Sequence, residues 1–269
     1  MQTAKTIVAQ IKELGPWFHN IYLPNGEQTA PQHFLGDFPS FKWEKIKIVI
    51  PEKLDGWKVL DIGCNAGFYS IELAKRGASV TAIDLDEHYL KQAKWVTKQF
   101  GLEDKIEFRQ MQVYDFAHTE EKFDLIWFMG VFYHLRYPLL ALDILSEKTI
   151  KMMVFQTYSL PGMEEMEIPQ DIDFQKREIL DSSPWPRMAF VPNKLAGDPT
   201  NWWIANHQGI LSLLKSCGMK VVEIPDDETY VAERDASLPT IQETWNASEY
   251  LSAVGKDWKT VVMEKTKNK

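Results

Sequence analysis

The feature that most constrains the fold of this chain is the segment 59–69, Val-Leu-Asp-Ile-Gly-Cys-Asn-Ala-Gly-Phe-Tyr. Its apolar, β-branched beginning predicts a buried strand, and an apolar pattern at helical spacing follows it. Between the two lies a turn bounded by Gly63 and Gly67, where a Cβ atom would block the turn or hold a ligand off the backbone. A strand, a glycine-rich turn and a helix in this order are typical of nucleotide-binding α/β units, because the helix N-terminus presents N–H groups to an anion.

Two aspartates indicate which nucleotide such a unit would bind. Asp61 opens the turn, where its charge would repel a pyrophosphate and would suit a cofactor that carries an ammonium and a sulfonium. Asp84 ends a second apolar strand 84 − 61 = 23 residues later, where it is placed to accept hydrogen bonds from ribose hydroxyls. Asn65 stands where a third glycine often falls, and asparagine tolerates a positive φ. The pattern therefore favours S-adenosylmethionine over NAD.

These motifs, with the strand Phe123-Asp124-Leu125-Ile126, resemble those of the class I S-adenosylmethionine-dependent methyltransferases. A closer resemblance is to the branch that contains the bacterial tRNA wobble-uridine carboxymethyltransferase. It extends from about Gly15 to the C-terminus and rests on four segments: Gly15-Pro16, Phe41-Lys42-Trp43, Met129-Gly130-Val131-Phe132-Tyr133-His134 and Leu214-Lys215-Ser216-Cys217-Gly218-Met219. The resemblance implies a Rossmann-like α/β fold and S-adenosylmethionine as the cofactor.

The resemblance also implies which residues bind the cofactor, and most of them follow the carboxyl ends of predicted strands. The candidate cofactor-binding residues are Lys42, Asp61, Gly63, Asn65, Gly67, Asp84, Leu85, Asp86, Val113, Tyr114 and Met129. For Val113, Tyr114 and Met129 the alternative is packing in the core of the fold.

Tyr133 and His134 are the candidate catalytic residues. In the resembling family, the tyrosine that matches Tyr133 lies by the transferable group of the cofactor. A neutral imidazole near pH 7 is a natural base for a hydroxyl that must lose its proton, so His134 favours an oxygen acceptor. The alternative for His134 is a structural histidine bonded to a nearby carbonyl. The other histidines and the 2 cysteines lack the spacing of metal ligands, and no metal is expected.

The resemblance leaves the transferred group open between methyl and carboxymethyl. The family holds the added carboxylate with a lysine before Gly-Pro, a lysine in the Lys-Trp helix, the tyrosine and an arginine near the C-terminus. The matching residues here are Leu14, Lys42, Tyr133 and, approximately, Lys259. Leucine removes one cation, and lysine in place of arginine loses bidentate pairing with a carboxylate. These two differences favour S-adenosylmethionine itself as the donor.

The charge of the chain bears on its partners. The net charge is −8 and the sequence pI about 5.4, whereas proteins that bind nucleic acids rely on Lys and Arg facing phosphates. A small or medium-sized acceptor is therefore favoured over tRNA, although an acidic chain can still carry a local basic patch. No run reaches the roughly 18 apolar residues that a membrane helix needs, and the start lacks the apolar core of a signal peptide. The expected location is the cytoplasm.

Strands and helices are expected to alternate from about residue 51 on, which predicts a mostly parallel seven-stranded sheet with helices on both faces. We expect a helical and irregular cap at 1–50 and a Rossmann-like domain at 51–269. The domain has an insertion at about 159–201, whose prolines and tryptophans favour an ordered wall of the acceptor pocket. The predicted strands are 57–62, 79–84, 105–110, 123–129, 151–157, 219–224 and 258–265. The predicted helices are 1–14, 41–50, 68–76, 87–100, 138–147 and 202–216.

The sequence therefore predicts an enzyme that transfers a methyl group from S-adenosylmethionine to a small or medium-sized acceptor, with oxygen as the first choice of acceptor atom. Two alternatives stay open. One is carboxymethyl transfer from carboxy-S-adenosylmethionine to a tRNA wobble uridine. The other is a partner subunit that binds the cofactor without catalysis, against which the intact Asp61, Gly63 and Asp84 argue.

Overall fold

The computed structural model describes residues 6–244 and 246–260, which fold into two compact units. The first unit consists of the described residues up to Val113 together with Phe123–Trp127. The second consists of Tyr114–Lys122 and the described residues from Phe128 onward. The division that the sequence predicts, with a cap at 1–50, a domain at 51–269 and an insertion at about 159–201, stays a prediction.

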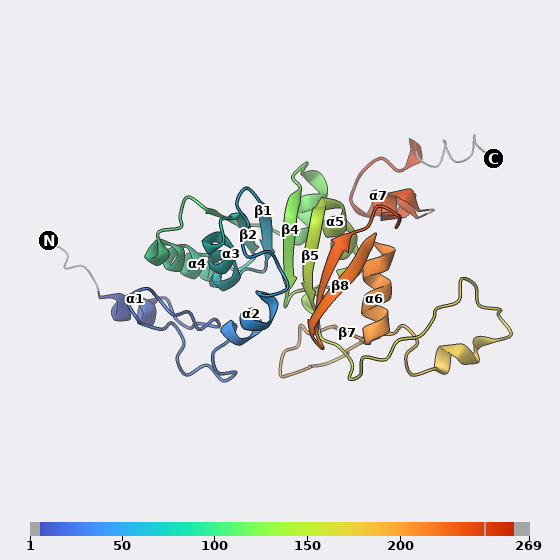
Figure 1. The fold of residues 1–269 in the computed structure, drawn as a ribbon, viewed down its shortest axis with the longest axis horizontal. Coiled ribbons are helices and arrows are strands. Elements are labelled where there is room, and N and C mark those ends of the chain that lie inside the picture. The colour runs from blue at the N-terminus through green and yellow to red at the C-terminus, as the bar shows by residue number, and fades with distance from the viewer. Residues whose placement is uncertain (1–5, 245, 261–269) are drawn as a thin grey trace. The chain divides into compact units, whose positions relative to one another are not determined.

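The first unit alternates helices and parallel strands (Figure 1). Its elements are α1 (Ile7–Glu13), α2 (Ser40–Ile46), β1 (Lys58–Ile62), α3 (Phe68–Lys75), β2 (Ser79–Asp84), α4 (Glu87–Phe100) and β3 (Ile106–Gln110). β1 pairs in parallel with β2, with Asp61 opposite Ala82, and β2 pairs in parallel with β3, with Asp84 opposite Gln110. Parallel pairing puts the carboxyl ends of β1 and β2, and so the two aspartates, at the same edge.

The second unit contains the remaining helices and strands (Figure 1). β4 (Phe123–Met129), which begins in the first unit and pairs in parallel with β1, leads into it. The other elements are α5 (Pro138–Lys148), β5 (Thr149–Gln156), β6 (Met188–Phe190), β7 (Trp203–Ala205), α6 (His207–Ser216), β8 (Met219–Asp226), β9 (Thr229–Arg234) and α7 (Ala247–Ala253). Short 3₁₀ helices among the described residues cover Val113–His118, whose first residue belongs to the first unit, and Phe132–His134, Arg177–Asp181 and Ile241–Glu243.

Seven strands form one sheet in the order β3-β2-β1-β4-β5-β9-β8, and β6 and β7 form a separate antiparallel pair. In the large sheet, β9 runs antiparallel to both β5 and β8. The predicted fold class, a mostly parallel seven-stranded α/β sheet with helices, is confirmed.

Three predicted elements differ from the observed ones. The sequence predicts a strand at 258–265, but β9 at Thr229–Arg234 is the strand beside β5, and residues 259–260 are helical. Residues 261–265 of that predicted strand lie outside the described residues. The predicted helix 202–216 begins only at His207, because residues 203–205 pair with β6 and the Asn206 side chain caps the helix. The predicted helix 41–50 is the third, because α2 ends at Ile46 and residues 47–50 form turns and bends. The predicted helix 1–14 is observed as α1, and residues 1–5 lie outside the described part.

Aromatic side chains pack around β4 in the first unit and around the turn that follows β4 in the second. In the first, the buried Trp127 ring lies 5.0 Å from Tyr69 and 5.7 Å from Trp43. In the second, Phe132 is buried against Phe155, with the ring centres 5.1 Å apart. Burying a side chain of this size stabilises a fold by about 1.5–3 kcal/mol, so Phe132 fixes the turn that carries the next two residues.

Across residues 6–244 and 246–260, no helix combines the length and the apolar character that crossing a bilayer requires.

Candidate functional site

The turn after β1 in the first unit needs residues that tolerate a positive φ. Gly63 has φ +66°, Asn65 +50° and Gly67 +83°. A Cβ atom on Gly67 would also lie 3.1 Å from the Cβ of Ala93 in α4, which is closer than side chains normally approach. Gly67 therefore lets α3 start immediately after the turn while α3 and α4 stay in close contact.

Asp84, at the end of β2, organises this turn. Its Oδ2 accepts a hydrogen bond from the Asn65 N–H at 2.9 Å, and its Oδ1 accepts one from the Asp86 N–H at 2.9 Å. The backbone of Leu85 also donates to this carboxylate, and since a carboxylate offers about four acceptor positions, acceptor capacity remains for the hydroxyl of a ligand. Burial raises the pKa of Asp84, and the hydrogen bonds from Asp86 and Asn65 oppose that rise.

Asp61 is the most deeply buried acid of the turn, with 1% of its surface exposed. Its Oδ2 accepts a hydrogen bond from the Ser70 hydroxyl at 2.5 Å. Burial raises the pKa of Asp61 to about 7; the Ser70 hydrogen bond opposes this shift, and the charge of Asp84 adds to it. A cationic ligand beside Asp61 would stabilise its ionised form.

Three of the predicted cofactor residues, Asn65, Asp84 and Asp86, are connected directly by these hydrogen bonds. Asp86 also caps α4 by accepting from the His88 N–H at 2.8 Å. Leu85 is exposed, and its carbonyl accepts from the Gln110 side chain at 3.0 Å.

The remaining candidates are more scattered. Val113 is buried at the start of a 3₁₀ helix, and Lys42 is half-buried in α2. In the second unit, the Tyr114 hydroxyl donates to the Tyr137 carbonyl at 3.4 Å, and Met129 is buried at the end of β4.

Tyr133 and His134 lie in the 3₁₀ helix that follows β4 in the second unit. Their ring centres are 4.5 Å apart, and the Tyr133 ring also lies 4.2 Å from Tyr158. Gly130 has φ +72°, and a Cβ there would lie 3.7 Å from the Tyr133 hydroxyl. Burial raises the pKa of Tyr133, and Tyr158, Glu228 and Asp198 raise it further, so its hydroxyl stays protonated at neutral pH.

His134 is connected to the insertion by its side chain. Its Nδ1 lies 2.9 Å from the Thr200 Oγ1, which in turn lies 2.6 Å from the Asp198 Oδ1. Burial lowers the pKa of His134, and the charge of Asp198 and a hydrogen bond with the Thr200 backbone oppose that shift. The imidazole is therefore neutral at pH 7, as a proton-accepting base must be.

Sequence reasoning did not single out four residues that act on the candidate catalytic pair: Asp198, Thr200, Tyr158 and Glu228. Asp198 and Thr200 belong to the insertion, which has no regular apolar period, and Glu228 lies in the turn between β8 and β9. Tyr158 follows β5 by two residues, so its place just after a predicted strand was the one available signal.

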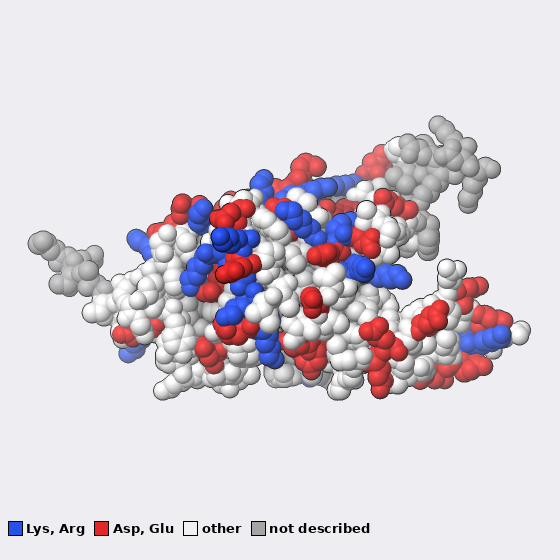
Figure 2. All heavy atoms as spheres, viewed as in Figure 1, with Lys and Arg blue, Asp and Glu red and all other residues white. Residues whose placement is uncertain are grey.

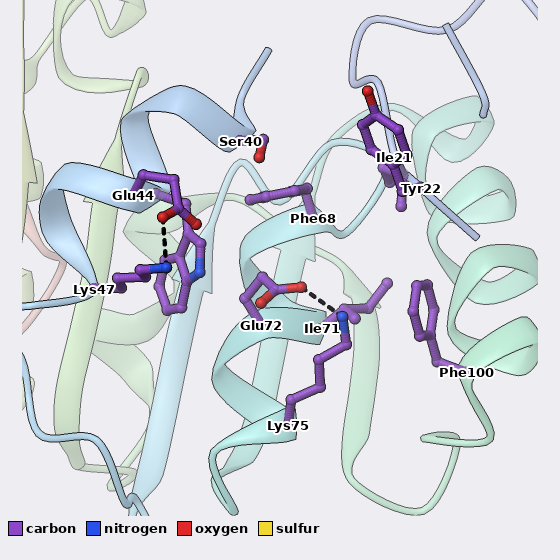
Figure 3. Close-up of a pocket in the computed structure, with 11 residues that line it drawn as sticks. Ile21, Tyr22, Ser40, Glu44, Lys47, Phe68, Ile71, Glu72, Lys75 and Phe100 are labelled. Atoms are coloured by element: carbon purple, nitrogen blue, oxygen red, sulfur yellow. Dashed lines mark hydrogen bonds and ion pairs between the residues drawn. The ribbon is translucent and has the colours of Figure 1, made fainter. Parts of the chain in front are cut away.

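A separate cavity of about 270 Å³ lies against α2 and α3 in the first unit (Figure 3). Trp43, Phe68 and Ile71 line it, with two ion pairs at its rim, Lys47–Glu44 at 2.5 Å and Lys75–Glu72 at 2.6 Å. None of the predicted site residues lines this cavity, and its lysines are already paired with acids.

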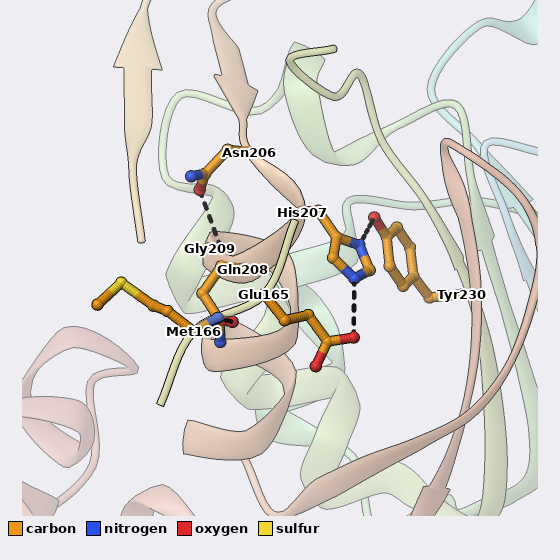
Figure 4. Close-up of polar contacts among 7 residues, drawn as sticks. All are labelled: Glu165, Met166, Asn206, His207, Gln208, Gly209 and Tyr230. Carbon is orange, nitrogen blue, oxygen red and sulfur yellow. Dashed lines mark hydrogen bonds and ion pairs between the residues drawn. The ribbon is translucent and has the colours of Figure 1, made fainter. Parts of the chain in front are cut away.

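In the second unit, polar contacts fasten the start of the insertion to α6 (Figure 4). The buried His207 ring has its Nδ1 2.9 Å from the Tyr230 hydroxyl and its Nε2 3.5 Å from Glu165. The Gln208 side chain accepts from the Met166 N–H at 3.0 Å. These contacts account for His207 as an anchoring residue.

Within the described part of the chain, no group of three or more His, Cys, Asp and Glu side chains is arranged to hold a metal ion.

Comparisons with known proteins agree with this geometry. A family model described as "Methyltransferase domain" matches residues 59–145. The chain is 34% identical over 116 residues to the ubiquinone biosynthesis O-methyltransferase of Actinobacillus pleuropneumoniae, a match that covers 38% of this chain and 49% of the relative. It is 25% identical over 235 residues to the tRNA U34 carboxymethyltransferase of Histophilus somni, covering 83% of this chain and 62% of that protein. The chain thus spans between about a third and a half of the length of the first curated relatives it matches.

Among solved structures, the N-terminal domain of EvdMO1, crystallised in the presence of SAH and D-fucose, superposes with a TM-score of 0.57 at 18% identity. That match covers 84% of this chain and 93% of the EvdMO1 chain, and at this identity it shows the fold. The chain therefore has the fold of the class I S-adenosylmethionine-dependent methyltransferases and resembles, within them, the tRNA U34 carboxymethyltransferase branch.

Proposed function

We propose that this protein is an S-adenosylmethionine-dependent methyltransferase that methylates an uncharged, small or medium-sized acceptor at oxygen. The observation that carries the proposal is the neutral His134, which stands beside Tyr133 in the turn after β4 and is hydrogen-bonded on its Nδ1 side. In this proposal the first unit binds the adenosyl part of the cofactor, and Tyr133 and His134 are the catalytic residues.

Cofactor binding is supported by the chemistry of the turn after β1. The Asp84 carboxylate retains acceptor capacity for a ribose hydroxyl, and the buried Asp61 favours a ligand that carries positive charge. Gly63, Asn65 and Gly67 allow the backbone to come close to the ligand. Lys42, Leu85, Asp86, Val113, Tyr114 and Met129 are proposed as further cofactor contacts.

The proposed step needs only one proton acceptor. The His134 Nε2 takes the proton of the acceptor hydroxyl while the oxygen attacks the methyl carbon. The carbon–sulfur bond breaks, and sulfur keeps the electron pair, which yields the methyl ether, S-adenosylhomocysteine and protonated His134. The Tyr133 hydroxyl, protonated at neutral pH, can donate a hydrogen bond to help position the acceptor.

The charges around Tyr133 support methyl over carboxymethyl transfer. Glu228 and Asp198 both raise the pKa of Tyr133, which means that negative charge already acts at its hydroxyl. A carboxylate on the transferable group would be repelled there, whereas the sulfonium of S-adenosylmethionine would be attracted. Leu14 replaces one cation of the carboxylate-binding family, and Lys259 is exposed with its N–H bonded to Asp257.

The surface of the insertion supports an acceptor without phosphates. Acidic side chains predominate over residues 163–181, toward the lower right of Figure 2; this segment contains seven acids and two bases. The acids are Glu164, Glu165, Glu167, Asp171, Asp173, Glu178 and Asp181, and the bases are Lys176 and Arg177. A tRNA backbone would be repelled by such a segment.

Carboxymethyl transfer to a tRNA wobble uridine is the second candidate function. It is favoured by the similarity to the Histophilus somni enzyme over 83% of this chain and by the presence of Lys42 and Tyr133. A partner subunit that binds the cofactor without catalysis is the third.

The choice of donor is testable by titrating the cofactor-free protein with S-adenosylmethionine and with its carboxylated analogue. We expect S-adenosylmethionine to bind at least as tightly, because the analogue loses on the order of 2 kcal/mol, or about thirtyfold in affinity, without the cation that Leu14 replaces. Leu14→Lys should shift the preference toward the analogue, and Leu14→Met, which keeps the site apolar, should not. A clear preference of the wild type for the carboxylated form would refute methyl transfer and support the second candidate.

The buried Asp61 predicts a proton linkage. The pKa of Asp61 is raised from 3.8 to about 7 in the folded protein, so between these values the folded state binds more protons than the unfolded state. Stability of the cofactor-free protein should therefore fall as pH rises through this window. Binding a cationic cofactor should release about one proton at about pH 6, measured by calorimetry in buffers of different ionisation enthalpy. Asp61→Asn should abolish the release and the exposed Asp104→Asn should keep it; release unchanged in Asp61→Asn would assign the proton elsewhere.

A further inference from the structure

A chain of three side chains in the second unit ends at the proposed base. The Asp198 Oδ1 accepts both the N–H of Thr200, at 2.7 Å, and its hydroxyl, at 2.6 Å. The same Thr200 oxygen lies 2.9 Å from the Nδ1 of His134, 66 residues earlier in the chain. Asp198 and Thr200 belong to the insertion, so the segment expected to form a wall of the acceptor pocket also contacts the side chain of the proposed base.

The protons that Asp198, Thr200 and His134 carry decide which atom donates in each of these hydrogen bonds. Burial alone would raise the pKa of Asp198, but the two hydrogen bonds from Thr200 lower it, and the charge of His134 acts in the same direction. The pKa of Asp198 is therefore below its usual range, and the ionised carboxylate can only accept hydrogen bonds. The single hydroxyl proton of Thr200 goes to Asp198, so toward His134 the Thr200 oxygen can only accept. The proton of the neutral imidazole is therefore on Nδ1, and its lone pair is on Nε2.

The residues directly after the insertion are hydrogen-bonded to the turn of His134 by bonds that do not use Thr200. The Trp202 N–H donates to the Tyr133 carbonyl at 2.8 Å, and the Trp203 indole N–H donates to the Leu135 carbonyl at 3.1 Å. These bonds keep the segment in place when the side chain of Thr200 is changed. A defect in a Thr200 variant can then be separated from loss of the fold.

We propose that Thr200 and Asp198 are positioning residues that hold His134 as the Nδ1-protonated tautomer, with Nε2 as the base for the acceptor hydroxyl. The inference rests on the proposed function, because it takes His134 as the base of the transfer. Thr200 sets the tautomer, and Asp198 supplies a negative charge that stabilises the imidazolium formed when Nε2 takes the proton. Because Asp198 stays ionised, the proton remains on His134 until solvent removes it.

The tautomer can be measured without any acceptor. In protein labelled with ¹⁵N-histidine, the two-bond couplings of His134 should identify a neutral ring with its proton on Nδ1 at pH 7. Thr200→Val has nearly the shape of threonine but no hydroxyl, so the Nδ1-protonated form should no longer predominate. Thr200→Ser restores the hydroxyl and should restore the tautomer. Thr119→Val, which removes a hydroxyl bonded to the Phe116 carbonyl in the same unit, is the matched control.

Asp198 is tested separately, because asparagine can still accept from Thr200 but carries no charge. Asp198→Asn should keep the tautomer and lower the pKa of His134, since the charge of Asp198 raises it. Asp235 makes the same turn with Ser237, accepting its N–H at 2.8 Å and its hydroxyl at 2.6 Å, but this pair is not linked to His134. Asp235→Asn should therefore leave the titration of His134 unchanged.

Measurements of kcat and of the cofactor Kd distinguish a failure of this inference from a failure of the proposed function. With an accepted substrate, Thr200→Val should lower kcat about tenfold with an unchanged cofactor Kd, and Thr200→Ser should recover it. Wild-type His134 protonated on Nε2, or a tautomer that does not respond to Thr200→Val, overturns the inference. If the tautomer responds as expected but no hydroxyl compound is methylated, the positioning holds and the proposed function is the part that fails.

Discussion

Replacing His134 with asparagine should lower kcat for methyl transfer on the order of a hundredfold or more, the usual contribution of a general base. The asparagine amide can still donate to the Thr200 oxygen, as Nδ1 does in the wild type, but no group remains at the position of Nε2 to take the proton. The loss should therefore appear in kcat, with the affinity for S-adenosylmethionine unchanged. Release of S-adenosylhomocysteine in the presence of uncharged phenols and alcohols measures it.

The pH dependence gives a second readout of the same variant. Burial lowers the pKa of His134 below 6.5, so the neutral base persists, and wild-type activity should decline only below that pH. His134→Asn should lack this decline, because its residual reaction no longer depends on an imidazole. The exposed His118→Asn is the control for loss of a histidine in the same unit. Full activity in His134→Asn would assign the base elsewhere and leave His134 a structural residue.

Asp84→Ala should weaken the binding of S-adenosylmethionine by about 1.5–3 kcal/mol, or roughly 10- to 150-fold. Both ribose hydroxyls would lose a charged acceptor, and charge-assisted hydrogen bonds are the stronger kind. The N–H groups of Asn65 and Asp86 would also lose the acceptor that holds the turn. Calorimetric titration of the cofactor-free protein measures the loss.

Asp84→Asn helps to separate the two contributions, because its carbonyl oxygen still accepts one hydrogen bond while the charge is gone. We expect its affinity to lie between those of the wild type and Asp84→Ala. The exposed Asp104→Ala controls for the change in net charge. Unchanged affinity in a folded Asp84→Ala protein would refute the assignment of Asp84 as the ribose acceptor.

Much of the first unit was predictable because its signals are local. Residues 59–75 contain a strand, a turn with residues suited to positive φ and a largely buried helix, each indicated by neighbouring residues. The observed φ values of Gly63, Asn65 and Gly67 agree with that prediction. Parallel pairing of β1 and β2 then brings Asp61 and Asp84 to the same edge of the sheet, as their positions at the ends of two predicted strands indicated.

The last strand of the sheet was mispredicted because strand propensity does not choose a partner. Residues 258–265 and 229–234 both have apolar, β-branched patterns, and only pairing with β5 and β8 selects the second segment. Residues 203–205 likewise form a strand rather than the start of a helix because residues 188–190 pair with them.

By itself, the sequence determined the α/β class, the glycine-containing turn after β1 and the candidates Tyr133 and His134, because these depend on neighbouring residues and strand ends. The tertiary structure alone decided the surroundings of His134. Its partner Thr200 lies 66 residues away, in a segment with no regular apolar period. A hydrogen bond between residues this far apart cannot be recognised from the spacing of residues in the sequence. Burial, which lowers the pKa of His134 and raises those of Asp61 and Tyr133, likewise arises only when distant segments exclude water together.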